Sequence, residues 1–234
     1  MILKDIVEEL SFQLKQRKII NVCVSPTYTS VMLDDQSIGI SHTLANGEIE
    51  IAGEIIGKNA YEVVVENLES DIQRSLSLAI INALGDINRY TQGDPINLYS
   101  GGKVCIFGFS PQIPSNRFDS VIIYDFSVNE YKKSGNVEIR PFNSLSHEMC
   151  TTLIIFGSAL VNNTIDRILN NISATHKILT GISSVDAVYT LKNYGFEIIG
   201  KIIPIDKYKV FRIICEGGSS RILNKYVTKY FRKI

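Results

Sequence analysis

The sequence TLIIFGSALVNNTIDRILNNI, at Thr152–Ile172, decides the fold of this chain. A continuous apolar run at 153–156 is followed by small residues at 157–159, and apolar residues then recur at 165, 168, 169 and 172. This order predicts a buried strand, a tight turn and an amphipathic helix, as in one βα unit of a sheet covered on both faces. In such sheets, ligands bind where the carboxyl ends of strands meet helix N-termini. The stretch therefore predicts where a site lies, but not which reaction occurs there.

Similar units surround this stretch in the second part of the chain. Short apolar strands are predicted at 103–107, 120–124, 152–156, 177–180 and 196–200. Helices are predicted at 144–150, 161–172, 185–193, 206–215 and 220–232. Because short buried strands alternate with helices, we expect a parallel-sheet α/β domain with right-handed crossovers.

The first part of the chain has a different pattern. Apolar residues at 2, 6, 10 and 14 predict an amphipathic helix, and the β-rich stretch 19–33 is interrupted at Ser25-Pro26. Further strands are predicted at 38–44 and 48–56, joined by the turn 45–47, and helices at 60–68 and 71–88. This succession predicts a small antiparallel α+β domain.

The stretch TQGDPINLYSGG, at 91–102, is the best domain boundary, because polar residues with Gly and Pro separate two periodic regions. We therefore expect an α+β domain at 1–95 and an α/β domain at 96–234.

Composition excludes several classes of function. The chain has 24 basic and 24 acidic residues, so no overall charge favours nucleic acid or an anionic membrane. The basic residues Lys225, Lys229, Arg232 and Lys233 are interpreted as the solvated end of the last helix. No apolar run reaches 18 residues, and no N-terminal signal segment is recognised. We expect neither a nucleic-acid partner nor a membrane partner.

The four cysteines are far apart in the sequence and form no CxxC pair. Cys23 and Cys105 lie in apolar strands, where a thiol behaves as a small hydrophobic group. This usage favours reduced thiols and a cytoplasmic location. His147 and Cys150 have a spacing that holds a metal on a helix, but two local ligands are too few, and chance explains the pair better.

Familiar catalytic and nucleotide-binding motifs are absent from the sequence. It contains neither GxGxxG nor GxxxxGK[ST], which argues against a dinucleotide-dependent enzyme and a P-loop enzyme. It also lacks HExxH, zinc-ribbon spacing and GxSxG.

Candidate site residues follow the predicted strands of the second domain. The loop 108–114, containing Ser110, forms either the edge of a pocket or a stiff turn. Gly157, Ser158 and Asn162 open the central helix, where they cap it or also hold a ligand. Ser183 in the next loop has the same two interpretations, and Glu216 begins a Gly-rich helix connection. Asn82 sits among apolar residues, where a buried amide must find partners: a backbone at the domain interface or, less favoured, a ligand.

Several segments make the chain resemble a known family. They are Thr29–Val31, Ile38–Thr43, Ser77–Leu84 (SLAIINAL), Gly157–Thr164 (GSALVNNT) and Glu216–Leu223 (EGGSSRIL), in that order along nearly the whole chain. The chain resembles a prokaryotic two-domain family labelled "putative heavy-metal chelation", in which an enolase-N-terminal-like domain precedes a Rossmann-like domain.

The resemblance implies a ligand site in the cleft between the domains. Carried over residue by residue, the site would comprise Thr29, Asn82, Ser110, Gly157, Ser158, Asn162, Ser183 and Glu216. Two segments depart from the family pattern, namely 181–185, where a proline-rich turn is usual, and Ser158-Ala159, where relatives have two threonines. Both departures touch the implied pocket, so a shared ligand does not follow.

Three hypotheses for function remain. The first is a binding protein for a metal ion, a metal complex or a small anionic ligand in the cleft. The oxygen donors of the implied site suit a Mg- or Ca-like divalent metal better than a soft heavy metal, and suit a metal complex or organic anion best. The second is an enzyme acting on a phosphorylated or nucleotide-like metabolite, with Glu216 or Asp125 as general acid–base. The third is a scaffold, and a homodimer stays open as an alternative.

Overall fold

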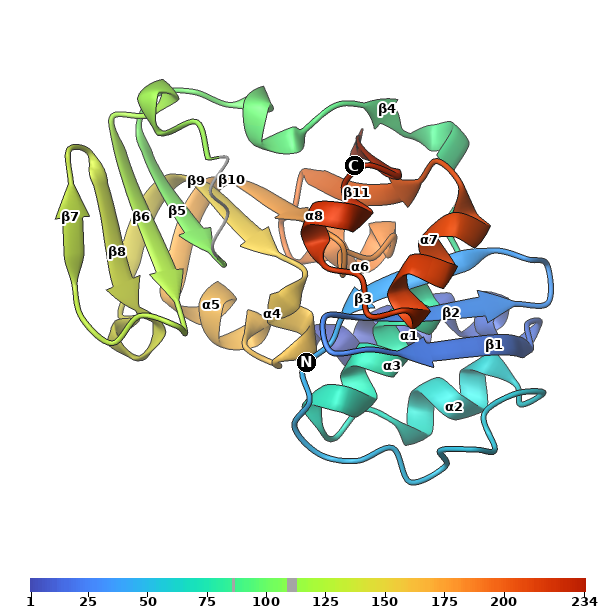
Figure 1. Ribbon diagram of the computed structural model, residues 1–234. Helices are drawn as coiled ribbons and strands as arrows, with labels where there is room; N and C mark the ends of the chain where they lie inside the picture. The colour runs from blue at the N-terminus through green and yellow to red at the C-terminus, as the bar shows by residue number, and fades with distance from the viewer. Residues whose placement is uncertain (86, 109–112) are drawn as a thin grey trace.

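The computed structural model describes residues 1–85, 87–108 and 113–234. Its first unit is a three-stranded antiparallel sheet, in the order β1-β2-β3, covered by helices (Figure 1). The elements of this unit are α1 (Ile2–Lys15), β1 (Ile19–Val24), β2 (Tyr28–Leu33), β3 (Ile38–His42), α2 (Ala60–Glu66) and α3 (Asp71–Asn82).

Helix α3 lies directly against β3 because of one glycine. A Cβ on Gly39 would lie 1.9 Å from the carbonyl oxygen of Ala79, so only glycine permits this approach. The start of α3 is fixed by a capping box, in which Ser70 and Gln73 each accept a hydrogen bond from the other's backbone N–H. The end of α3 therefore lies beside Gly39 and Ile40 of β3, and Asn82 at this end also contacts Ile182 of the second unit.

The second unit is a mixed sheet in the order β4-β12-β11-β10-β9-β5-β6-β8-β7 over the described residues. Its strands are β4 (Thr91–Gln92), β5 (Lys103–Phe107), β6 (Ser120–Asp125), β7 (Lys132–Ser134), β8 (Val137–Pro141), β9 (Glu148–Phe156), β10 (Ile172–Thr180), β11 (Ile198–Pro204) and β12 (Val227–Lys233). Its helices are α4 (Ser158–Val161), α5 (Ile165–Asn171), α6 (Val188–Asn193), α7 (Lys207–Cys215) and α8 (Ser220–Leu223). Single 3-10 turns occur as η1 (Ile87–Arg89), η2 (Pro95–Leu98), η3 (Ser115–Arg117) and η4 (Phe142–Ser144).

The centre of this sheet has the strand order of dinucleotide-binding folds. Strands β8, β6, β5, β9, β10 and β11 are mutually parallel, and numbered in chain order they read 3-2-1-4-5-6. The chain runs from β5 outward to β6 and β8, and then returns to place β9 on the other side of β5. The direction of winding therefore reverses between β5 and β9, which is where ligands bind in such sheets.

The predicted fold class is confirmed: a small antiparallel α+β unit precedes an α/β unit with a largely parallel sheet. Three expectations in the first unit and the loop that precedes β9 are wrong. The stretch 48–56 forms turns instead of a strand, α3 ends at Asn82 instead of 88, and 144–150 is not a helix. Glu148–Cys150 belongs to β9 instead, because β10 pairs with it from Ile172 onward.

The end of the chain also differs from the prediction. The expected helix 220–232 is the short α8 followed by β12, which pairs antiparallel with the whole of β11. The basic residues near the terminus are therefore not a helix end. Lys229 lies 2.6 Å from Asp94, and Arg232 lies 3.4 Å from Asp186. None of the helices in the described ranges is long and apolar enough to cross a membrane.

The largest buried apolar cluster of the described residues contains side chains from both units. Leu14 and Ile80 of the first unit belong to the same buried cluster as Leu153 and Ile199 of the second. The boundary between 1–95 and 96–234 stays a prediction.

The cysteines are close in space although they are distant in sequence. Cys23 of β1 forms a disulfide with Cys215 of α7, and Cys105 of β5 forms one with Cys150 of β9. Their Cα atoms are 5.4 and 5.9 Å apart, within the usual range for a disulfide. The expectation of isolated, reduced thiols is therefore wrong, because strand and helix packing brings the residues together.

Candidate functional site

A cavity of about 600 Å³ opens at the carboxyl ends of the central parallel strands. We call it the strand-end cavity. The ends of β5, β6, β9 and β10 form one wall, and β2, β3 and Leu44, two residues after β3, form the wall that faces them. Its polar or aromatic lining residues are Tyr28, His42, Asp125, Phe126, Ser127, Phe156, Ser158, Asn162, Ser183 and Asn224. The cavity lies at the reversal of winding, where the fold places ligands.

Glycines shape the floor of the strand-end cavity. Gly108 and Gly181 leave β5 and β10 with φ of +104° and +101°, a left-handed conformation that favours glycine. Gly157 follows β9, and a Cβ there would lie 2.3 Å from the backbone at Ser183 and Ser184. The glycines at these strand ends let Phe156 and the loop at Ser183 and Ser184 pack closely against the backbone.

Asp125 provides a carboxylate at the end of β6. Its Oδ1 accepts hydrogen bonds from the backbone N–H of Ser127, at 2.7 Å, and from the Ser127 hydroxyl. These bonds fix the carboxylate through one oxygen, and Asp125 itself is only partly buried. The next residue, Phe126, is exposed and stacks on Phe142 with ring centroids 4.2 Å apart. An acidic group and an aromatic ring thus stand side by side at the cavity edge.

His42 provides a neutral imidazole on the opposite wall. Burial lowers the pKa of His42, and its ring Nδ1 has no hydrogen-bond partner among the described residues. The Tyr28 ring meets it edge to face, with centroids 6.0 Å apart. His42 thus lines the cavity with a neutral ring whose Nδ1 is buried and unpaired among the described residues.

The structure brings four of the predicted site residues to this cavity: Gly157, Ser158, Asn162 and Ser183. Two of them already have protein partners. The Ser183 hydroxyl accepts the backbone N–H of His42 at 2.8 Å, which ties the two units together. The Asn162 side-chain oxygen accepts the Thr164 hydroxyl at 2.6 Å. Thr164 is the N-cap of α5.

The other predicted residues lie elsewhere. Asn82 lines a neighbouring cavity, and its amide nitrogen donates to the carbonyls of Ile40 and Ile182, at 2.9 and 3.2 Å. Thr29 is buried beside the strand-end cavity and hydrogen-bonds Thr43 at 2.8 Å. Glu216 is exposed at the end of α7, away from the lining of the strand-end cavity. Ser110 lies outside the described residues.

Sequence reasoning left several lining residues out of the predicted site. Three of these lining residues lie in strands or at strand ends, namely Tyr28, His42 and Phe156. The alternation of apolar and polar residues there predicts a strand but does not indicate a binding site. Asp125 was considered only as an acid–base group. Its position at the end of the second parallel strand is the signal that identifies it, since dinucleotide-binding folds place an acidic residue about 20 residues after the first turn.

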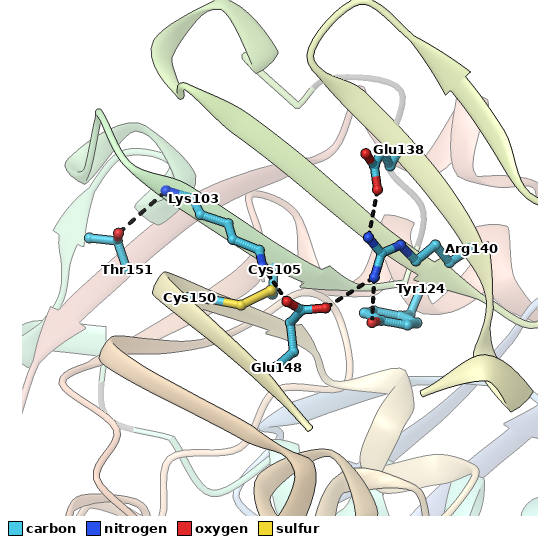
Figure 2. The surroundings of a disulfide bond; sticks show 8 residues. All are labelled: Lys103, Cys105, Tyr124, Glu138, Arg140, Glu148, Cys150 and Thr151. Atoms are coloured by element: carbon cyan, nitrogen blue, oxygen red, sulfur yellow. Dashed lines mark hydrogen bonds and ion pairs between the residues drawn. A yellow bond between two sulfur atoms is a disulfide. The ribbon is translucent and has the colours of Figure 1, made fainter. Parts of the chain in front are cut away.

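A second group of charged residues surrounds the disulfide between Cys105 and Cys150 (Figure 2). Arg140 contacts Glu148 at 3.0 Å and Glu138 at 2.6 Å, and Lys103 pairs with Glu148. Hydrogen bonds from Arg140 and Lys133 lower the pKa of Glu138 to about 2. Because these charges satisfy one another, we interpret the group as structural bracing of β5, β8 and β9.

Comparisons with known proteins assign the family. A family model described as "Putative heavy-metal chelation" (DUF364) matches residues 94–233, and a second model with the same description (DUF4213) matches residues 7–85. The chain belongs to this family. No curated protein matches the chain.

Two solved structures share the fold. A DUF364-family protein of unknown function from Desulfitobacterium hafniense DCB-2 is 17% identical, with a TM-score of 0.79 over 98% of each chain. Another from Pyrococcus horikoshii is 18% identical, with a TM-score of 0.81 over 100% of each chain. At this identity the likeness shows the fold alone.

The residues of the strand-end cavity do not fit direct chelation of a heavy metal. Soft metals prefer thiolate and imidazole ligands, but the lining offers one imidazole, one carboxylate and neutral oxygens. The paired cysteines lie outside this lining. Within the described ranges, no three or more His, Cys, Asp or Glu residues gather closely enough to hold a metal ion.

Proposed function

We propose that this protein binds a nucleoside-like small molecule in the strand-end cavity: a ring system joined to a sugar with neighbouring hydroxyl groups. The observation that carries the proposal is the position of Asp125. Its carboxylate stands at the end of the second strand of a 3-2-1-4-5-6 sheet, beside the reversal of winding. An acidic residue there accepts hydrogen bonds from ribose hydroxyls in dinucleotide-binding folds.

The other residues that line the strand-end cavity are suited to binding a flat ring of the ligand. Tyr28, Phe126 and Phe156 offer aromatic surface, and His42 adds a neutral imidazole ring to the same lining. A volume of about 600 Å³ lies within the range of small-molecule sites. Asp125 is the acidic residue of this lining, so a ligand with hydroxyl donors fits better than an anion.

Binding of the pyrophosphate of a dinucleotide has less support. In the usual dinucleotide fold, a GxGxxG turn and the helix after the first strand hold the pyrophosphate. Here the turn motif is absent, and residues 113–119 before β6 form only the 3-10 turn η3. We therefore favour a single nucleoside unit.

Calorimetric titration with adenosine tests the proposal. We expect saturable binding of one adenosine per chain, and much weaker binding of 2′,3′-dideoxyadenosine, which lacks the hydroxyl donors. Asp125→Asn keeps the shape and the Oδ1 acceptor for Ser127 but removes the charge. Because a hydrogen bond to a charged group contributes about 1.5–3 kcal/mol, affinity should fall about tenfold to a hundredfold.

The matched control is Glu130→Gln, which removes an exposed carboxylate five positions further along the same loop. It should bind adenosine as the unaltered protein does. Equal affinity for adenosine and its dideoxy analogue, or equal losses in both variants, would refute ribose recognition by Asp125.

A further inference from the structure

A second cavity, of about 270 Å³, lies between the end of α3, strand β3 and strand β11. It shares Ile182 and Ile202 with the strand-end cavity, but its other lining residues are different. Its walls are mainly aliphatic, with Ile38, Ile40 and Ile203 among them. Polar groups enter this apolar space at a few points.

Lys201 of β11 brings a cationic side chain into the second cavity. The residue is 8% exposed, and its Nζ lies 3.0 Å from the position that a Cβ on Gly85 would occupy. No hydrogen bond or ion pair joins this nitrogen to a described residue. Asp186 is close enough to act on Lys201 electrostatically, but its hydrogen-bond partner is Arg232. Burial lowers the pKa of Lys201 and so disfavours its charged form, which an anion bound beside Nζ would stabilise.

Asn82 brings an unpaired acceptor into the same cavity. Its Nδ2 donates to the carbonyls of Ile40 and Ile182, which fixes the orientation of the amide. Its Oδ1 is buried and has no partner among the described residues, although the side chain is only 9% exposed. Leaving a buried acceptor without a hydrogen bond costs free energy, so a ligand that donates a hydrogen bond to it would be favoured. Tyr90 lines the same space, where burial and the nearby Asp186 carboxylate raise the pKa of its hydroxyl.

We propose that this second cavity binds a small, branched aliphatic 2-hydroxycarboxylate. The carboxylate pairs with the Lys201 ammonium, the 2-hydroxyl donates to Asn82 Oδ1, and the alkyl branch packs on the isoleucines of the wall. Lys207, at the start of α7, adds a second, partly exposed cation to the lining. The ligand thus supplies an anion beside Lys201 Nζ and a hydrogen-bond donor to Asn82 Oδ1, which has no hydrogen-bond partner among the described residues.

Calorimetric titration with 2-hydroxy-4-methylpentanoate tests this site. We expect saturable binding, at least tenfold weaker binding of the primary amide of the same acid, and weaker binding of 4-methylpentanoate, which lacks the hydroxyl. Lys201→Met keeps much of the side-chain volume and should lower the affinity at least tenfold. The control Lys209→Met removes an exposed lysine of α7 and should bind normally. Adenosine binding should be unchanged by Lys201→Met, which separates this site from the strand-end cavity.

A measurement on the unaltered protein tests the proposal even if the Lys201→Met variant does not fold. Acetic anhydride modifies lysine amines, and peptide mass spectrometry measures the modification at each position. We expect 2-hydroxy-4-methylpentanoate to protect Lys201 at least threefold and to leave Lys209 unprotected. Equal affinity for the acid and its amide, normal binding by a folded Lys201→Met variant, or the absence of protection at Lys201 would each overturn the proposal.

Discussion

Replacement of Asn82 by alanine tests how the two units are held together. The Asn82 amide nitrogen reaches from the end of α3 to Ile40 on β3, at 2.9 Å, and to Ile182 in the loop after β10, at 3.2 Å. It thus joins the first unit to the second across buried surface. Asn82→Ala would leave both carbonyls without this donor.

The expected magnitude follows from these two bonds. Each buried hydrogen bond contributes about 0.5–1.5 kcal/mol, so their loss should lower the free energy of unfolding by about 1–3 kcal/mol. For a chain of this length, the melting temperature falls by about 2–4 °C per kcal/mol. We expect a decrease of about 6 °C, measured by circular dichroism during heating, and a matching shift in urea denaturation.

Asn67→Ala is the matched control. Asn67 is also buried, but its Nδ2 makes one hydrogen bond, to the carbonyl of Val63 within α2, at 2.8 Å. Asn67→Ala should lower the free energy of unfolding by about 1 kcal/mol. If Asn67→Ala destabilised the protein as much as Asn82→Ala or more, the interpretation of Asn82 as a strut between the units would be refuted.

Three further predictions concern other parts of the structure. Gly157→Ala should destabilise by about 1–3 kcal/mol in urea denaturation, because its Cβ would lie 2.3 Å from the backbone at Ser184. The pKa of Glu138 is about 2 in the folded protein, against an ordinary 4.5. Its ionised carboxylate therefore contributes stability above pH 4.5, and this contribution is lost as the pH falls through about 2. Glu138→Gln should therefore flatten the pH dependence of unfolding between these values. Cys215→Ser should lower the unfolding free energy of the oxidised protein by about 2–4 kcal/mol, and should have little effect under reducing conditions, because the disulfide with Cys23 constrains a separation of 192 residues in the unfolded chain.

The fold was largely predictable where local pattern and tertiary contacts agree. The apolar run 103–107 forms strand β5 with the predicted first and last residues. The predicted order of strand, turn and helix after 152 is also present. The prediction failed where long-range pairing decides the structure. Residues 227–233 carry a pattern compatible with a helix, and only the partner strand β11 makes them β12.

The candidate site was predictable in position but not in composition. The parallel strand pattern placed Gly157, Ser158 and Ser183 at one edge of the sheet, and the cavity lies there. The facing wall, with His42, comes from the first unit, so its contribution depends on how the two units pack. No local pattern in the sequence encodes that packing, and the same holds for the pairing of the cysteines.

Native mass spectrometry, combined with elemental analysis of the same sample, tests the central claim most directly. The protein would be incubated separately with adenosine and with Zn²⁺ or Cd²⁺, then desalted. We predict one retained adenosine per chain, reduced by Asp125→Asn, and no stoichiometric metal. A stoichiometric metal that survives desalting, together with no retained adenosine, would contradict the account and favour direct chelation.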